Sequence, residues 1–176
     1  MKRTGNRKTI RLKEYDYSLP GDYFVTICSF NHECIFGEIV GEEIKLSPEG
    51  MIVEQCWKEI PNHFPNVDLD AFVVMPNHVH GIIILNESVG VEYIQPLQKT
   101  FQHIVPNSIP SIVRSYKAAV TIGCRKMRSQ FHWQRNYYEH IIRDDKDMNN
   151  IREYIANNPL QWAADKENLS KDSCHT

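Results

Sequence analysis

The sequence lacks any run of about 20 apolar residues, so no segment of it is predicted to cross a lipid bilayer. Residues 1–13 are basic but have no apolar core, which argues against a secretory signal peptide. The five cysteines include no C-x-x-C pair, and this argues against both a disulfide framework and a cysteine-type zinc site. We therefore expect a cytoplasmic protein with reduced thiols and no membrane partner.

The 176 residues suffice for one well-packed domain and are too few for two, and 41% of them are hydrophobic, as in an ordinary globular protein. No internal repeat or low-complexity segment divides the chain. We predict a single domain over residues 1–176, with a flexible basic arm at residues 1–18 and a polar tail at residues 166–176.

The charge is unevenly distributed, although the net charge is only −2. Residues 1–13 hold six Lys or Arg and no acid, and residues 93–138 hold seven and again no acid. Such acid-free basic segments are typical of a surface that binds phosphate groups. The alternative is that these side chains only cover a solvated helix.

The order of the predicted elements indicates an α+β fold. Strands are expected at residues 23–30, 67–75 and 78–85, with a fourth inside 131–143, and helices at 47–60, 108–128 and 144–157. A short hairpin is expected at residues 34–46, and Pro61 is expected to end the first helix. Strand, helix, strand, strand, helix, strand is the ferredoxin-like split βαβ order. We predict an antiparallel sheet with two helices on one face and an additional C-terminal helix.

His78 and His80 are the sharpest local feature of the sequence. On a strand, side chains alternate between the two faces, so both imidazoles point the same way and Val79 points the other way. Two imidazoles side by side can bind one divalent metal ion, and we expect them to converge on a solvent-accessible pocket. Alternatively, they are structural histidines beside a turn.

The final predicted helix carries Tyr154 and Asn158. Residues four apart lie on the same face of a helix, so both side chains can enter one site. Taken alone, each could equally be structural, because Tyr154 has apolar neighbours and Asn158 precedes a proline. Together with His78 and His80 they form a set that could bind a metal ion and supply a nucleophilic phenol.

The combined motifs resemble those of a known family. Residues 73–81 are VVMPNHVHG, and residues 154–160 are YIANNPL. This pattern is similar to the single-tyrosine HUH transposases, and most similar to the REP-associated tyrosine transposases. The resemblance extends over nearly the whole chain, including YFVTIC at 23–28 and WQRNYYEHIIR at 133–143. Asn158 stands where many insertion-sequence relatives have Gln.

The resemblance implies a chemistry and a role for each residue. Tyr154 matches the nucleophile, and His78, His80 and Asn158 match the metal ligands of the family. The implied activity is that of a DNA transposase, a metal-dependent nuclease that cuts and rejoins single-stranded DNA through a 5′-phosphotyrosine. The implied cofactor is Mg²⁺ or Mn²⁺, and the implied partner is single-stranded or hairpin DNA.

DNA binding is expected from the basic residues Arg114, Lys117, Arg125 and Lys126, which lie on one predicted helix. Two other functions are compatible with the sequence. One is a domesticated DNA-binding protein of the same fold that acts in repair or regulation. The other is an unrelated metal hydrolase, which would give neither Tyr154 nor the basic segments a role. The sequence is compatible with a monomer and with a homodimer.

Overall fold

The computed structural model describes residues 15–87, 105–164 and 167–168. Four strands form one antiparallel sheet in the order β4-β5-β1-β6, with β5 and β1 in the centre. This is the predicted split βαβ fold, and both strands expected at its centre are there. The strands are β1 (Gly21–Cys28), β4 (Val67–Val74), β5 (His78–Leu85) and β6 (Tyr138–Ile142).

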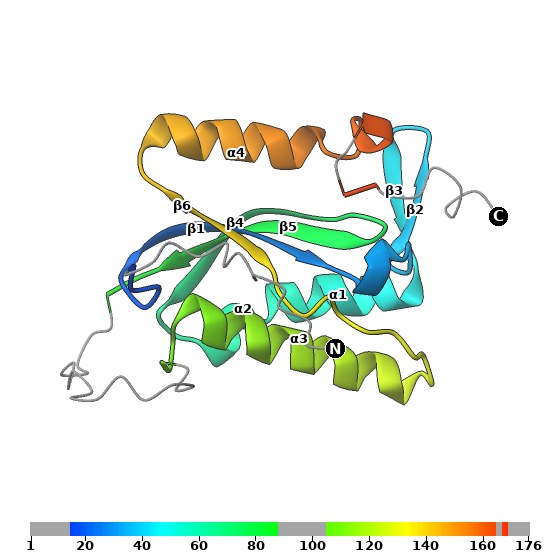
Figure 1. The fold of residues 1–176 in the computed structure, drawn as a ribbon, viewed down its shortest axis with the longest axis horizontal. Coiled ribbons are helices and arrows are strands. Elements are labelled where there is room, and N and C mark those ends of the chain that lie inside the picture. The colour runs from blue at the N-terminus through cyan, green and yellow to red at the C-terminus, as the bar shows by residue number, and fades with distance from the viewer. Residues whose placement is uncertain (1–14, 88–104, 165–166, 169–176) are drawn as a thin grey trace, which may run out of the picture.

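Helices cover both faces of the sheet (Figure 1). The helices α1 (Pro48–Lys58), α2 (Ile60–His63) and α3 (Ile109–Lys126) lie on one face, and α4 (Asp145–Asn157) lies on the other. The expected arrangement, two long helices on one face and an additional C-terminal helix, is confirmed. Three smaller elements complete the described fold: the hairpin β2 (Gly37–Val40) and β3 (Glu43–Leu46), and the 3-10 turns η1 (Phe30–His32) and η2 (Trp162–Ala164).

Local chemistry explains where the helices begin. The hydroxyl of Ser47 accepts a hydrogen bond from the backbone N–H of Gly50, and the carboxylate of Asp144 accepts one from Asp147, so each caps its helix. Pro61 was expected to end the first helix, but α1 already ends at Lys58. Pro61 instead lies in the first turn of α2, where its missing N–H costs nothing.

Two buried cores lie on the two faces of the sheet. The larger lies between the sheet and the α1 and α3 helices, and it includes Trp57, Ile83 and Ile112. Gly81 permits the closest contact there, because an added Cβ would lie only 2.2 Å from the Trp57 ring. The smaller core lies beneath α4 and consists of Phe24, Ile82, Ile142, Met148 and Ile155.

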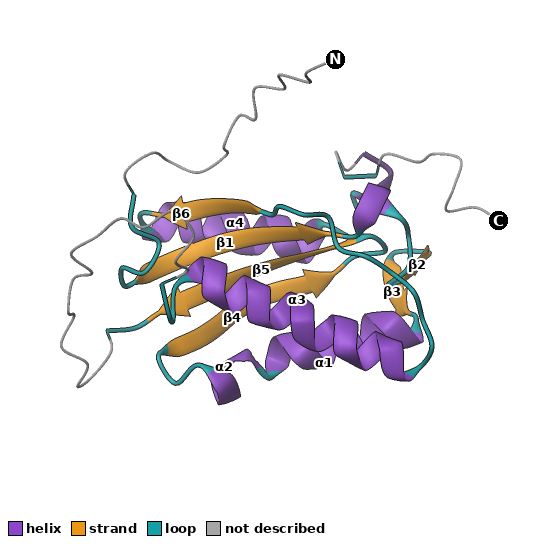
Figure 2. Ribbon diagram, turned by 60° about the horizontal axis from the view of Figure 1, so that its bottom comes forward, coloured by secondary structure: helices purple, strands orange, loops and turns teal. Residues whose placement is uncertain are grey.

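Seen obliquely, α3 runs across the sheet beside α1 and ends at the end of the sheet where the hairpin lies (Figure 2). Its C-terminus is therefore at the same end of the sheet as the start of β5. No helix among the described residues is long and apolar enough to span a bilayer. Residues 1–14 of the expected arm at 1–18, and all but residues 167 and 168 of the expected tail at 166–176, lie outside the described residues.

Candidate active site

His78 and His80 lie on one face of β5, as strand alternation predicts. Their cross-strand partners on β1 are Cys28 and Thr26. The two Nε2 atoms are 2.9 Å apart, and the ring centroids are 4.3 Å apart. The structure therefore brings the two imidazoles together at the first residues of a central strand.

The expectation that this pair opens onto a solvent-accessible pocket is wrong for this structure, because both residues are completely buried. Aromatic rings cover them: Phe24 stacks on His80 at 5.3 Å between centroids, and Trp162 lies 6.1 Å from His78. The sequence could not predict this cover, because Trp162 lies beyond the final helix and its packing depends on the path of the chain.

Asn77 determines which nitrogen of the His78 ring carries a proton. Its amide nitrogen donates to the backbone carbonyls of His32 and Glu167, at 3.0 and 2.9 Å, which orients the amide. Its oxygen then lies 2.7 Å from Nδ1 of His78. Because an amide oxygen only accepts, Nδ1 must carry a proton, and in the neutral ring Nε2 is left with a lone pair. That lone pair points at His80.

His80 is oriented by Thr26, whose hydroxyl lies 2.8 Å from Nδ1. When that hydroxyl accepts the Nδ1 proton, Nε2 of His80 also has a lone pair. Two such nitrogens at 2.9 Å repel each other unless a proton or a metal ion lies between them. When the hydroxyl instead donates to Nδ1, Nε2 of His80 carries the proton and donates it to Nε2 of His78, and both rings are neutral.

The spacing of the pair fits a metal ion. Two nitrogen ligands about 2.1 Å from one ion and at right angles to each other would be about 3.0 Å apart. The 2.9 Å between the Nε2 atoms agrees with this value. The hydrogen bonds at both Nδ1 atoms are the outer contacts that commonly orient metal-binding histidines. His78 and His80 thus offer two nitrogen ligands, and the hydrogen bonds that orient them, to a divalent metal ion.

Tyr154 on α4 lies against this pair. Its hydroxyl is 3.1 Å from Nε2 of His80, and the two rings are 5.1 Å apart between centroids. Asn158, the C-cap of α4 one turn later, is almost completely buried. The structure thus brings Tyr154 and the two histidines together, and it buries Asn158 on the same helix.

An ion pair and a further hydrogen bond hold α4 on the sheet. Arg152 donates to both carboxylate oxygens of Asp70 on β4, at 2.9 and 2.7 Å, and this contact lowers the pKa of Asp70. His140 on β6 lies 2.8 Å from a carboxylate oxygen of Asp147. His140 thus supports the helix that carries Tyr154.

Three of the four predicted DNA-binding residues, Arg114, Arg125 and Lys126, are exposed on α3. Lys117 differs from the expectation. It is partly buried, donates to the carbonyls of Gln134 and Asn136, and lies 5.9 Å from the centroid of the Trp133 ring. Burial lowers its pKa to about 8. The charge pattern of the sequence could not distinguish this lysine from its exposed neighbours.

A hollow of about 580 Å³ lies at the C-terminal end of α3. Sequence analysis did not predict it, because its lining combines the helix with the segment that follows. Two of its lining residues are basic, Arg125 and Arg128, and together with the neighbouring exposed Lys126 we call them the basic surface. The hollow itself is lined by Thr121, Arg125, Arg128, Ser129, Gln130, Phe131 and His132.

The expectation that all thiols are reduced is wrong at Cys34, which is disulfide-bonded. Cys28, Cys56 and Cys124 are not in disulfide bonds. Cysteine spacing in the sequence could not show this, because pairing depends on which segments the fold brings together.

The split βαβ fold, with Tyr154 beside the histidine pair, gives the chain a transposase-like structure. A solved structure of a REP-associated tyrosine transposase bound to a REP hairpin is similar, with a TM-score of 0.60 and 21% identity, covering 89% of this chain and 77% of that one. The resemblance inferred from the sequence is confirmed. No family model matches the sequence.

Two curated proteins of Haemophilus influenzae are similar in sequence. One, described as an uncharacterized protein, is 48% identical over 166 residues, which are 92% of each chain. The other, a putative REP-associated tyrosine transposase, is 30% identical over 111 residues, covering 60% of this chain and 56% of the relative. This chain belongs to the same family as the first, and it is related to the REP-associated tyrosine transposases.

Proposed function

We propose that this protein is a metal-dependent nuclease and strand transferase for single-stranded DNA, acting in DNA transposition with Tyr154 as the nucleophile. One observation carries the proposal. The Tyr154 hydroxyl lies 3.1 Å from Nε2 of His80, and that nitrogen lies 2.9 Å from Nε2 of His78. A phenol, two imidazoles and a buried amide from Asn158 are the groups that such a reaction needs.

The proposed reaction exchanges one phosphodiester bond for another. The Tyr154 oxygen loses its proton, attacks the phosphorus and displaces the 3′ oxygen, which takes up a proton. The products are a 5′-phosphotyrosine and a free 3′ hydroxyl. The reverse attack by a 3′ hydroxyl rejoins a strand and releases Tyr154, so no external energy source is needed.

His78, His80 and Asn158 are proposed to hold the metal ion. When bound, Mg²⁺ or Mn²⁺ would act as a Lewis acid on the non-bridging phosphate oxygens. The chain itself orients the ligands. Asn77 and Thr26 form hydrogen bonds with the two Nδ1 atoms, so that both Nε2 atoms face the proposed ion position. Because the tyrosine and both histidines come from one chain, a monomer contains the whole proposed site.

DNA must reach a site that is closed in this structure. Trp162 and Tyr154 cover the histidines, so we propose that the segment after α4 moves aside when a strand enters. The basic surface lies at the same end of the sheet but on the face opposite to α4, so we propose that a strand bound there passes around this end of the sheet to reach the histidine pair. The hairpin named for the related transposase structure supports hairpin DNA as the substrate.

The test is a cleavage assay on single-stranded hairpin DNA with Mg²⁺ or Mn²⁺. We expect a protein–DNA adduct that survives denaturation, together with a free 3′ hydroxyl. Tight DNA binding without an adduct would contradict the proposed nuclease activity and favour a regulatory DNA-binding protein. Absence of both would favour a metal hydrolase with another substrate.

A further inference from the structure

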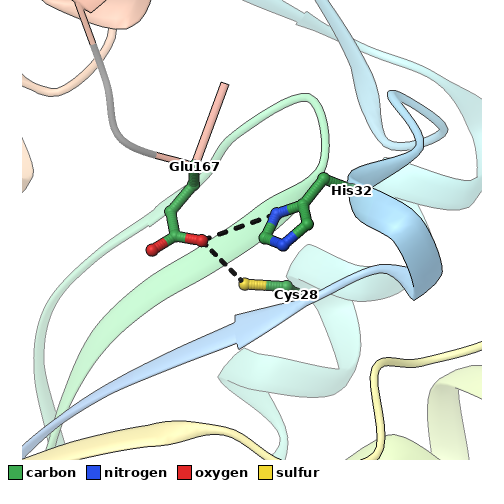
Figure 3. A group of neighbouring side chains, drawn as sticks. All are labelled: Cys28, His32 and Glu167. Atoms are coloured by element: carbon green, nitrogen blue, oxygen red, sulfur yellow. Dashed lines mark hydrogen bonds and ion pairs between the residues drawn. The ribbon is translucent and has the colours of Figure 1, made fainter. Parts of the chain in front are cut away.

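Three side chains that could hold a metal ion lie close together (Figure 3), and one of them, Cys28, is the cross-strand partner of His78. Cys28 is the last residue of β1, His32 ends η1, and Glu167 follows η2. One ligand atom from each lies within 4.8 Å of the other two. Figure 3 shows the carboxylate of Glu167 facing both the thiol and the imidazole.

The separations are those of ligands around one tetrahedral ion. The Glu167 Oε2 atom is 3.6 Å from the Cys28 sulfur and 3.5 Å from Nδ1 of His32. With about 2.3 Å from zinc to sulfur and about 2.1 Å to nitrogen or oxygen, tetrahedral angles require separations of about 3.6 and 3.4 Å. Both separations from Glu167 therefore match those of ligands on such an ion, and the Cys28 and His32 ligand atoms lie within 4.8 Å of each other.

The chemistry of the ligands selects the ion. A thiolate and an imidazole favour a borderline-soft ion such as Zn²⁺ over Mg²⁺ or Ca²⁺, which prefer oxygen ligands. The Cys28 thiol would release its proton to solvent on binding. Thiolate and carboxylate together carry two negative charges, which balance the charge of Zn²⁺. All three residues are at most partly exposed, so this neutralisation takes place largely away from water.

The backbone that presents His32 is unusual. Asn31 and His32 both have left-handed backbone angles, with φ of 53° and 56°. Two consecutive residues other than glycine rarely adopt this conformation, which costs free energy unless other contacts stabilise it. Here it turns the imidazole towards Cys28 and Glu167, so an ion bound by all three would supply a compensating contact.

We propose that Cys28, His32 and Glu167 form a Zn²⁺ site that holds the segment after α4 over the histidine pair. The connection passes through Asn77, whose amide nitrogen donates to the carbonyls of His32 and Glu167 and whose oxygen faces Nδ1 of His78. Ligation would fix the two carbonyls relative to each other, and so fix the orientation of Asn77. The three residues are positioning residues and are not part of the proposed cleavage chemistry.

Cobalt binding tests the site without any DNA. Metal-free full-length protein would be titrated with Co²⁺, because a cysteine thiolate bound to Co²⁺ gives a charge-transfer absorption that histidine and oxygen ligands cannot give. We expect this absorption at one Co²⁺ per chain and its loss when one equivalent of Zn²⁺ is added. Its absence in the wild-type protein would overturn the proposal.

Matched variants locate the site. Cys28→Ser should abolish the absorption, and Cys56→Ser, which removes another thiol, should leave it unchanged. The opposite pattern would overturn the assignment. Glu167→Gln keeps the shape of the side chain and should weaken Co²⁺ binding by at least about 10-fold. Should Cys28→Ser fail to fold, an unchanged affinity in Glu167→Gln would be sufficient to reject the site.

Hydrogen exchange tests whether Zn²⁺ holds the segment after α4 over the histidine pair, which we call the closure. Zn²⁺ should slow amide hydrogen exchange in residues 160–164 and 167–168 of the wild-type protein but not of Cys28→Ser. Equal exchange rates with and without Zn²⁺ would contradict the closure. This inference does not depend on the proposed nuclease, since a protein that never forms a DNA adduct would still give the cobalt absorption.

Discussion

The Tyr154 hydroxyl and Nε2 of His80 lie 3.1 Å apart, although 74 positions separate the two residues in the sequence. One comes from a helix and the other from a central strand, and they meet because α4 packs on the face of the sheet that carries both histidines. The contact is between a potential nucleophile and a potential metal ligand. It gives the most direct test of the proposed chemistry.

Tyr154→Phe removes one hydroxyl and retains the ring. Folding and DNA binding should survive, while adduct formation and cleavage should both fall by at least about 1,000-fold. Denaturing electrophoresis of labelled DNA measures both products. Tyr137→Phe and Tyr138→Phe are the controls, because these residues are the nearest alternatives in the sequence. An adduct formed by Tyr154→Phe would place the nucleophile elsewhere.

Asn77→Ala removes the oxygen that accepts the His78 Nδ1 proton. The ring could then place its proton on either nitrogen, so the affinity of the pair for Mn²⁺ should fall by about 10- to 100-fold. Isothermal titration calorimetry with Mn²⁺ measures this loss. Asn86→Ala, which removes an exposed amide hydrogen bond to Asp68, is the control. Equal Mn²⁺ affinity in both variants would show that Asn77 does not orient His78.

Gly81→Ala should destabilise the fold by about 1–3 kcal/mol, because the added Cβ would lie 2.2 Å from the Trp57 ring. Urea denaturation followed by circular dichroism measures the free energy of unfolding. Combining Gly81→Ala with Trp57→Phe, which provides space for the added methyl group, tests whether this clash causes the loss of stability. The double variant should lose less stability than the sum of the single variants. Strict additivity would disprove the clash.

Lys117 should make stability depend on pH. Burial lowers its pKa to about 8 in the folded protein, from 10.5. Between these values the unfolded chain binds more protons, so the contribution of Lys117 to the free energy of unfolding should rise with pH and level off above 10.5. Burial raises the pKa of Tyr23 and Tyr116, which opposes this trend above about pH 10. A comparison with Lys117→Met isolates the lysine, and parallel pH profiles would refute the shift.

Arg125→Ala combined with Lys126→Ala should weaken the binding of single-stranded DNA and flatten its salt dependence. Each lost phosphate contact lowers the slope of log affinity against log salt by about 0.7. Fluorescence anisotropy at several salt concentrations measures the slope. Lys58→Ala is the control, because Lys58 lies on α1 in an ion pair with Glu54. An unchanged slope would remove these two residues from the DNA surface.

The parts of the fold that follow from local periodicity could be predicted from the sequence. Alternation along a strand put His78 and His80 on one face, and helical spacing related Tyr154 to Asn158. Contacts between distant segments could not be predicted in this way. The cluster of Cys28, His32 and Glu167 joins three elements, and its ligands have no recognisable spacing. Lys117 shows a further limit, since sequence charge does not reveal burial.

The two unequal cores make the tyrosine helix a separable part of the molecule. The larger core packs the sheet against α1 and α3, whereas α4 packs on the smaller core and makes one ion pair, Arg152–Asp70, and one hydrogen bond, His140–Asp147, with the sheet. Detaching α4 therefore costs only a fraction of the free energy of global unfolding. A nucleophile on such a helix can carry a covalently bound DNA end away from the sheet and return it to a different strand, while the histidine pair stays where it was built.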